Sequence, residues 1–392
     1  MFGTLVDYWD MTGDESYNKI TMQALIHQAG PDRDYMPENQ TLQMGNDDQG
    51  FWTMAAMSAA EKGFPDPPED EPQWLALAQA CFNEWVGRWD DDHCGGGLRW
   101  QIFPFNEGYD YKNTISNGCF FNVASRLALY TGNKTYAEWA EKIYDWQEET
   151  GLINEKYQVF DGRHAIEGGG CGKIDTIEWT YNAGIYLHGV AALWNHTEDA
   201  KWKTRVEGIL KNSMSRFWRD ETLYEQFCER GDVCNQDQRT FKGYLLRWLA
   251  ATWQWAPYTR EDIMPLIADA GVDAAQSCVG PVMERFQGHD GTACGYSWLN
   301  GGGFDGKVGV GEQMNALDAI MYNLVADAKV PVTADTGGTS KGDANGGRSD
   351  DSKLPTLTPI TTGDRVGAGI LTAILVALML AFASYLIIDG KY

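Results

Sequence analysis

A short break between two helices recurs along the first 331 residues, and it constrains the fold more than any other feature of the chain. Each break follows an apolar, Ala/Gly-rich helix and precedes a charged, amphipathic one. The breaks lie at Gly13, Gly63, Gly132, Asn195 and Pro257, at spacings of 50, 69, 63 and 62 residues. Such a period is typical of a repeat with two helices per unit.

The two helix types predict a ring of two layers, because apolar helices are buried and amphipathic helices face solvent on one side. The apolar, inner helices are expected at 1–9, 46–62, 112–131, 178–194, 237–255 and 311–328. The outer helices are expected at 14–28, 71–89, 134–148, 198–217 and 260–278. The sequence therefore predicts an all-α fold, an (α/α)6 barrel that lacks one outer helix.

The connections between these helices are unequal. Outer-to-inner loops are long and rich in Gly, Asp, Trp and Cys, whereas inner-to-outer turns are short. Long loops carry function more often than short ones, and helix N-termini favour carboxylates. We expect the functional site where the inner helices begin.

Composition narrows the class of ligand. The net charge is −24 and the pI is near 4.5, so the chain would repel phosphate backbones and is not expected to bind nucleic acid. There are 16 Trp, 18 Tyr and 15 Phe, more than a core needs, and aromatic faces suit the C–H faces of sugar rings. No metal or cofactor is expected, and the domain is expected to be a monomer.

Several features favour the secretory pathway. The eight cysteines are compatible with disulfides, and Cys228 with Cys234 and Cys278 with Cys294 are the predicted pairs. Sequons at Asn39, Asn133 and Asn195 are predicted N-glycosylation sites.

The C-terminal part differs in composition from the rest. A linker of Gly, Ser, Thr and Asp at 332–366 is expected to be disordered, which leaves 1–331 as the catalytic domain. Residues 367–388 form an apolar stretch without charge, long enough for a membrane span. The very short remainder favours a GPI-attachment signal over a permanent span.

The N-terminus lacks the leader that secretion requires. The chain opens with MFGTLVDYWD, which is amphipathic and aromatic rather than a signal peptide. We expect that this start is internal to a longer protein, and that the sixth outer helix precedes Met1.

Two adjacent carboxylates open the second inner helix, at Asp47 and Asp48 in MGNDDQGFW. Acidic residues at a helix start are usually caps. This pair, however, lies on the long-loop face with Phe51 and Trp52 beside it. Retaining glycosidases need two carboxyls about 5 Å apart. We therefore interpret Asp47 and Asp48 as catalytic, and Trp52 as a substrate-binding residue.

Several ordered motifs resemble glycoside hydrolase family 76. They are NDDQ at 46–49, MTGD at 11–14, CGGGLRW at 94–100, NTISNGCFF at 113–121 and EWTYNAGIYLHGVAALW at 178–194. More narrowly, they are similar to the fungal GPI-anchored cell-wall branch related to mannan endo-1,6-α-mannosidase. The resemblance covers residues 1–328. This chain lacks the segment that, in relatives, leads into the first inner helix.

The resemblance implies an (α/α)6 fold and a retaining mechanism, with Asp47 as nucleophile and Asp48 as acid/base. It also implies cell-wall biogenesis as the setting, with α-mannan or a GPI-glycan as donor. The acceptor is water in a hydrolase or wall β-glucan in a transglycosylase, and the residues do not separate the two. The cell surface is the implied location.

Other positions are weaker candidates for binding. Trp100 is expected to stack on a sugar or to pack in the core. Asn117 and Asn182 are expected to bond mannose hydroxyls or to satisfy loop backbone. Glu178 and Glu312 open inner helices and could be catalytic neighbours or caps; we interpret them as caps. The run 90–93, DDDH, is interpreted as a solvated loop rather than a metal site.

Two alternatives to a mannan-active enzyme remain at this stage. One is a non-catalytic mannan-binding wall protein on the same scaffold, against which the intact Asp47 and Asp48 argue. The other is a different sugar enzyme, such as an epimerase or glucuronyl hydrolase. Those enzymes usually need histidines, and the six here form no evident constellation: His27, His93, His164, His188, His196 and His289.

Overall fold

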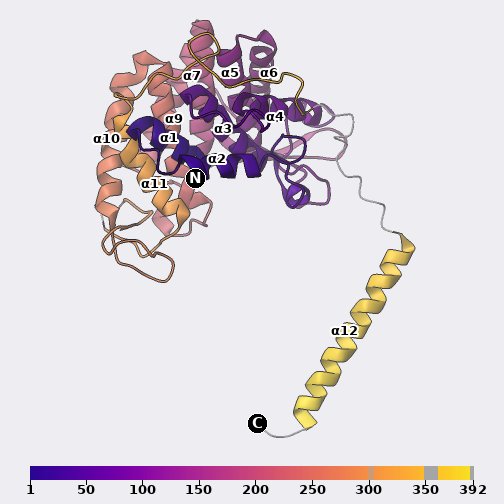
Figure 1. Cartoon of the computed structure of the whole chain (residues 1–392). Helices are drawn as coiled ribbons and strands as arrows, with labels where there is room; N and C mark the ends of the chain where they lie inside the picture. Colours follow the sequence, from indigo (N-terminus) through magenta and orange to yellow (C-terminus); the bar gives the residue numbers. More distant parts are fainter. Residues whose placement is uncertain (300, 302, 348–360, 389–392) are drawn as a thin grey trace. The chain divides into compact units, whose positions relative to one another are not determined.

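The structure is a computed structural model that describes residues 1–299, 301, 303–347 and 361–388. The chain divides into two units, Met1–Ser349 and Asp350–Tyr392, and each is described by itself. Figure 1 shows the first unit as a helical barrel and the second as a single long helix.

The first unit confirms the predicted (α/α)6 barrel. The inner helices are α1 (Phe2–Thr12), α3 (Asn46–Lys62), α5 (Thr114–Thr131), α7 (Thr180–Thr197), α9 (Phe241–Trp255) and α11 (Val310–Met321). Each contacts the next, and α1 closes the ring against α11. The outer helices are α2 (Asn18–His27), α4 (Trp74–Arg88), α6 (Lys134–Glu149), α8 (Ala200–Phe217) and α10 (Arg260–Ser277). In the described part of the chain, no outer helix lies between α11 and α2.

The inner-to-outer turns follow the predicted signals with one correction. Gly63 and Gly132 end α3 and α5 in the left-handed region, at φ 62° and 68°, where an L side chain is disfavoured. The break predicted at Asn195 is wrong by three residues, because α7 continues to Thr197 and Glu198 adopts the left-handed turn at φ 54°. Asp199 then caps α8 by accepting a hydrogen bond from the backbone N–H of Lys201.

The long loops contain strands that the helical pattern did not predict. β1 (Tyr111–Asn113), β2 (Phe160–Ala165) and β3 (Cys171–Glu178) form an antiparallel sheet. Two small hairpins pair β4 (Trp218–Arg219) with β5 (Thr222–Leu223) and β6 (Cys278–Gly280) with β7 (Ala293–Cys294). Short 3-10 helices lie at Thr41–Gln43, Glu229–Gly231, Gln238–Thr240, Pro257–Thr259 and Tyr322–Leu324.

Disulfides hold these loops together. Both predicted pairs, Cys228–Cys234 and Cys278–Cys294, are confirmed. A third disulfide, Cys94–Cys171, joins two loops 77 residues apart and was not predicted. Cys81 and Cys119 are buried free thiols.

A strap, residues 329–347, crosses the short-turn end of the barrel (Figure 1). The backbone N–H of Val332 donates to the carbonyl of Glu61, and that of Ala334 to the carbonyl of Tyr130. The disorder predicted for 332–366 is therefore wrong over 332–347, because the barrel supplies hydrogen-bond partners that composition does not reveal. Residues 348–360 of the predicted linker lie outside the described residues. The predicted disorder is also wrong over 362–366, which belong to the helix α12 (Thr362–Ile388).

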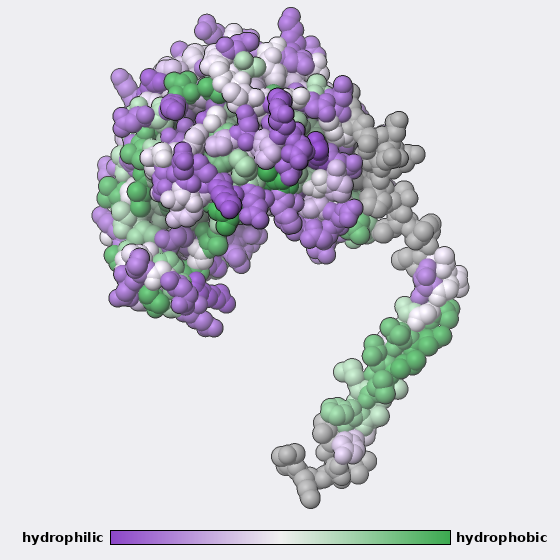
Figure 2. Space-filling view, viewed as in Figure 1, coloured by the Kyte–Doolittle hydropathy of each residue, from purple (hydrophilic) through white to green (hydrophobic). Residues whose placement is uncertain are grey.

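The second unit contains α12 (Thr362–Ile388). Its stretch Thr362–Tyr385 contains an 18-residue window with a mean hydropathy of 2.5 and is long and apolar enough to cross a membrane. Figure 2 shows this helix with a mostly hydrophobic surface. It contains the apolar stretch predicted at 367–388.

Candidate active site

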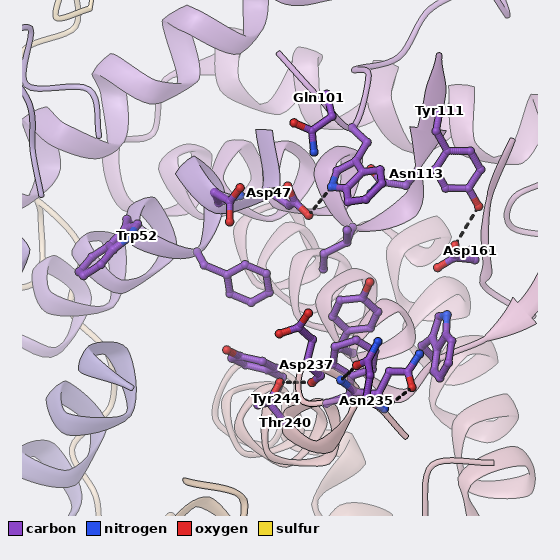
Figure 3. Close-up of a pocket in the computed structure, with 18 residues that line it drawn as sticks. Asp47, Trp52, Gln101, Tyr111, Asn113, Asp161, Asn235, Asp237, Thr240 and Tyr244 are labelled. Atoms are coloured by element: carbon purple, nitrogen blue, oxygen red, sulfur yellow. Dashed lines mark hydrogen bonds between the residues drawn. The ribbon is translucent and has the colours of Figure 1, made fainter. Parts of the chain in front are cut away.

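A pocket of about 630 Å³ opens on the long-loop face of the barrel, where the inner helices begin. Its walls come from the start of α3, the segment 100–115, β2, the start of α7, and the start of α9 with the loop before it. The lining residues are Asp47, Asp48, Phe51, Trp52, Trp100, Gln101, Tyr111, Asn113, Ile115, Asp161, Trp179, Tyr181, Asn235, Asp237, Gln238, Thr240, Phe241 and Tyr244 (Figure 3).

Local backbone bonds fix the position of Asp47 and Asp48. Gly45 is the extended residue before α3, and its N–H donates to Oδ2 of Asp48 at 2.8 Å. Asp48 therefore caps its own helix while facing the pocket. The indole N–H of Trp100 donates to Oδ2 of Asp47 at 3.1 Å, and the N–H of Asn46 donates to the carbonyl of Trp100 at 2.9 Å.

The two carboxyls lie close together around Gly45. A Cβ built on Gly45 would lie 2.3 Å from Oδ1 of Asp47 and 3.4 Å from Oδ2 of Asp48. These two oxygens are therefore no more than about 5.7 Å apart, the sum of the two distances. Such a spacing fits the about 5 to 5.5 Å of a retaining pair better than the wider spacing of an inverting one.

Both carboxyls hold protons more tightly than free aspartate does. Burial, and then the charge of Asp48, raise the pKa of Asp47 to about 7. Burial also raises the pKa of Asp48, against the N–H of Gly45, and the charge of Asp237 adds to the rise. Asp48 is open to the pocket, but surrounding protein weakens its solvation. The pair can thus hold one proton near neutral pH, as acid/base chemistry requires.

Two further aspartates line other walls of the pocket. Asp161 on β2 accepts hydrogen bonds from the hydroxyl of Tyr111 at 2.8 Å and from the amide of Asn182 at 3.3 Å. Asp237 lies on the wall opposite Asp47 (Figure 3). Among the 18 described residues that line the pocket there is no Lys, Arg or His. The site is therefore acidic without a compensating cation.

The structure places four of the six predicted functional residues in the pocket: Asp47, Asp48, Trp52 and Trp100. Trp52 also stacks between Phe2 and Tyr35, with ring centroids 5.7 and 6.1 Å away. Trp100 was expected to stack on a sugar or to pack in the core, and neither alternative included the hydrogen bond that its indole N–H donates to the proposed catalytic carboxyl of Asp47. Sugar stacking by either ring stays a prediction.

Asn117 and Asn182 do not line the pocket. Asn117 is fully buried and bonds the N–H and carbonyl of Leu98 and the carbonyl of Asn113, so its role as a substrate ligand is wrong and the loop-backbone alternative is right. Asn182 is also buried, behind Asp161, and reaches the site only through that carboxylate.

Three other acidic positions also differ from expectation. Glu178 caps no helix, because its carboxylate pairs with Arg216 on α8 at 2.9 Å. Asp90 is not simply solvated, since it pairs with Arg99 at 2.7 Å and Lys112 at 3.2 Å and so ties the loop to β1. Glu312 lies in the first turn of α11 but makes no side-chain cap hydrogen bond there, and its carboxylate pairs with Arg239 at 2.6 Å.

All three predicted sequon asparagines, Asn39, Asn133 and Asn195, are exposed. The amide nitrogen of Asn195 donates to the carbonyl of Trp255 at 2.9 Å. Glycan attachment at these positions stays a prediction.

Sequence reasoning missed Asp161, Asp237 and most of the aromatic wall. Asp237 could have been identified from the sequence, because it is an acidic residue at the start of the fifth predicted inner helix, as Asp47 is at the start of the second. Asp161 could not have been identified, because strand pairing brings it to the pocket and no local sequence pattern encodes that pairing.

Comparison with known proteins gives a consistent family. Residues 1–335 match the model for glycosyl hydrolase family 76. The chain is 47% identical to mannan endo-1,6-alpha-mannosidase DCW1 of Saccharomyces cerevisiae over 390 residues, which cover 98% of this chain and 84% of that protein. It is 43% identical to mannan endo-1,6-alpha-mannosidase DFG5 of the same yeast, over 98% of this chain and 83% of that protein.

Solved structures agree. The crystal structure of Dfg5 from Chaetomium thermophilum in complex with glucosamine matches with a TM-score of 0.84 and 47% identity, covering 90% of this chain and 85% of that chain. An alpha-1,6-mannanase from Salegentibacter shares the fold at a TM-score of 0.64 and 20% identity, over 82% of this chain and 87% of that chain. The chain therefore belongs to glycosyl hydrolase family 76.

Proposed function

We propose that this chain is a retaining glycosidase or transglycosylase of the mannan endo-1,6-α-mannosidase type, acting on α-1,6-linked mannose chains with Asp47 and Asp48. The observation that carries the proposal is the placement of two proton-holding carboxyls within about 5.7 Å of each other in an acidic, aromatic-walled pocket. The names of the yeast relatives support α-1,6-mannan as the substrate class.

The reaction proceeds in two displacements. In the first, one carboxylate attacks C1 of a mannose unit, and the other carboxyl protonates the departing glycosidic oxygen, so the C1–O bond breaks as a mannosyl ester forms. In the second, the deprotonated acid/base takes a proton from water or a sugar hydroxyl, whose oxygen attacks C1 and releases the ester. Water yields hydrolysis and a sugar hydroxyl yields transfer.

The proposed roles are Asp47 as nucleophile and Asp48 as acid/base. In the free pocket burial raises the pKa of both carboxyls, so the pair shares a proton. These roles require that proton to lie on Asp48 when substrate binds. A 2-fluoro-mannosyl trap followed by peptide mapping identifies the esterified aspartate, and a label on Asp48 would reverse the assignment.

The proposed setting is the fungal cell surface, with α-mannan or a GPI-glycan as donor and wall β-glucan as acceptor. Three disulfides and the exposed sequons at Asn39 and Asn133 support passage through the secretory pathway. The apolar α12 supports attachment to a membrane, through a GPI signal or as a span.

The deciding experiment incubates the purified protein with α-1,6-mannan oligomers, with and without a β-glucan acceptor, and identifies products by mass. Asp48→Asn should lower turnover by about 10³-fold or more, because a catalytic carboxyl is lost. Its melting temperature should stay within a few degrees, since asparagine still accepts the hydrogen bond from Gly45.

Asp199→Asn is the matched control, because Asp199 caps α8 outside the pocket. It should share the small effect on stability and leave turnover intact. Oligomer binding without products in the wild type would favour the non-catalytic mannan-binding alternative. Collapse of folding in Asp48→Asn would make the carboxylate a structural cap.

A further inference from the structure

Four aromatic rings form a row that runs from the pocket wall to the molecular surface. Tyr181 and Phe241 line the pocket and stack flat on each other, with ring centroids 3.8 Å apart at 2°. Trp179, also in the lining, packs edge-on against Phe241 at 5.5 Å. Phe227 continues the row with an edge-on contact to Trp179 at 5.3 Å, and 58% of its surface is exposed.

The loop that carries Phe227 is held in place on both sides of this residue. The next residue, Cys228, is buried and joined to Cys234. Glu229 is buried and accepts hydrogen bonds from the N–H of Glu225 at 2.8 Å and from the ammonium group of Lys242 at 3.0 Å. Phe227 is thus held at the surface by an anchored backbone, and it does not fold into the core.

Single exposed apolar residues are common and need no function. Phe227 differs in two respects from Val233, which is 68% exposed on the same disulfide loop. Its ring contacts a residue that lines the pocket, and the same loop continues to Asn235, Asp237 and Gln238, which form the pocket wall. The ring therefore extends the site beyond its rim.

We propose that Phe227 is a stacking platform for a pyranose ring of the mannan chain outside the pocket. This rests on the proposed function, because a polymer cleaved within its length must cross the rim of a pocket that encloses only a few rings. The C–H face of a pyranose packs on an aromatic face, and a rigid ring pays little entropy to bind it. Phe227 would then set the preference for long over short chains.

The test compares kcat/KM for an α-1,6-mannose hexamer and trimer. Phe227→Ala should lower the hexamer-to-trimer ratio by about fivefold, as expected for one lost aromatic contact. Phe227→Tyr, which keeps the ring, should restore the ratio, and Val233→Ala should leave it at the wild-type value. Dissociation constants for both oligomers, measured on the Asp48→Asn background, should show the same ratio change without chemistry.

The outcomes separate this proposal from the one it rests on. An unchanged ratio in Phe227→Ala overturns the platform, and so does an equal loss for both oligomers, which would mean that Trp179 has moved. Turnover or binding of neither oligomer by the wild type overturns the proposed function itself. Binding without turnover overturns catalysis alone, and the platform is then judged on the dissociation constants.

Discussion

Both ends of the barrel contain clustered carboxylates, but the two clusters differ in their charged partners. At the short-turn end Glu61 pairs with Arg126 at 2.5 Å, Asp10 with Lys62 at 2.6 Å and Asp7 with Arg247 at 2.7 Å. At the long-loop end Asp47, Asp48, Asp161 and Asp237 share a pocket whose described lining contains no cationic residue. A paired cation opposes the rise in carboxyl pKa that burial causes, whereas crowding of carboxylates without a cation adds to that rise.

This contrast separates stability from chemistry. Residues at the short-turn end should affect folding without affecting turnover, and residues around the pocket should do the reverse. Measuring both stability and activity on the same variants tests each half of this contrast.

The largest expected effect is on folding. Glu61→Gln leaves the buried guanidinium of Arg126 without its charged partner, which should cost about 3–5 kcal/mol of unfolding free energy. Denaturant unfolding measures the loss, and kcat of the folded fraction should remain near wild type. Glu207→Gln, in an exposed pair with Lys203 on α8, is the control and should cost less than about 0.5 kcal/mol. Equal losses in both variants would contradict the contrast.

The next effect is on turnover. In Gly45→Ala the new Cβ would lie 2.3 Å from Oδ1 of Asp47, so the carboxylate must shift by nearly 1 Å. A displacement of this size should lower kcat by about 10²-fold. Gly87→Ala adds a methyl to open space on α4 and should change neither kcat nor folding appreciably. Wild-type kcat in Gly45→Ala would show that the position of Asp47 is not critical.

The third effect depends on pH. Since the folded pKa of Asp47 is raised from 3.8 to about 7, the wild type loses stability as pH rises between these values. Asp47→Asn removes this loss, so its melting temperature should match the wild type near pH 4 and exceed it by a few degrees near pH 8. Asp14→Asn should be less stable than the wild type by a similar amount at both pH values, because hydrogen bonds from Ser16 lower the pKa of Asp14 from 3.8 and its contribution is lost only at pH below that value. A pH-independent difference in Asp47→Asn would contradict the raised pKa of Asp47.

Local sequence patterns predicted the features that local physics encodes. The alternation of apolar and amphipathic helices predicted the barrel, and the bounds of the second inner helix at 46–62 match α3. Asp47 and Asp48 could be predicted because an inner helix start on the long-loop face places them. Cys228 and Cys234 are close in sequence, so their pairing needed no tertiary information.

Features that depend on distant partners could not be predicted. The sheet that carries Asp161 is formed by strands from separate loops, and Cys94–Cys171 spans 77 residues. The amide side chain of Asn117 is of a type that can bond sugar hydroxyls, but its partners are backbone groups of the segment at Leu98. The strap has a disordered composition, yet its hydrogen bonds come from helices that lie far away in sequence.

The smallest effect tests that strap. Ser340 is buried, and its hydroxyl accepts a hydrogen bond from the N–H of Leu75 in the first turn of α4, at 3.0 Å across 265 residues. Ser340 thus supplies a cap from outside the helix, and Ser340→Ala should leave that N–H unsatisfied at a cost of about 1 kcal/mol. Thr339→Ala removes an exposed hydrogen bond to Asp66 and should cost less, because water replaces that bond.

Neither variant should change kcat, since both residues lie at the short-turn end. Amide exchange at Leu75 gives a local reading, because protection should fall in Ser340→Ala and persist in Thr339→Ala. Equal protection in both variants would mean that the strap does not cap α4.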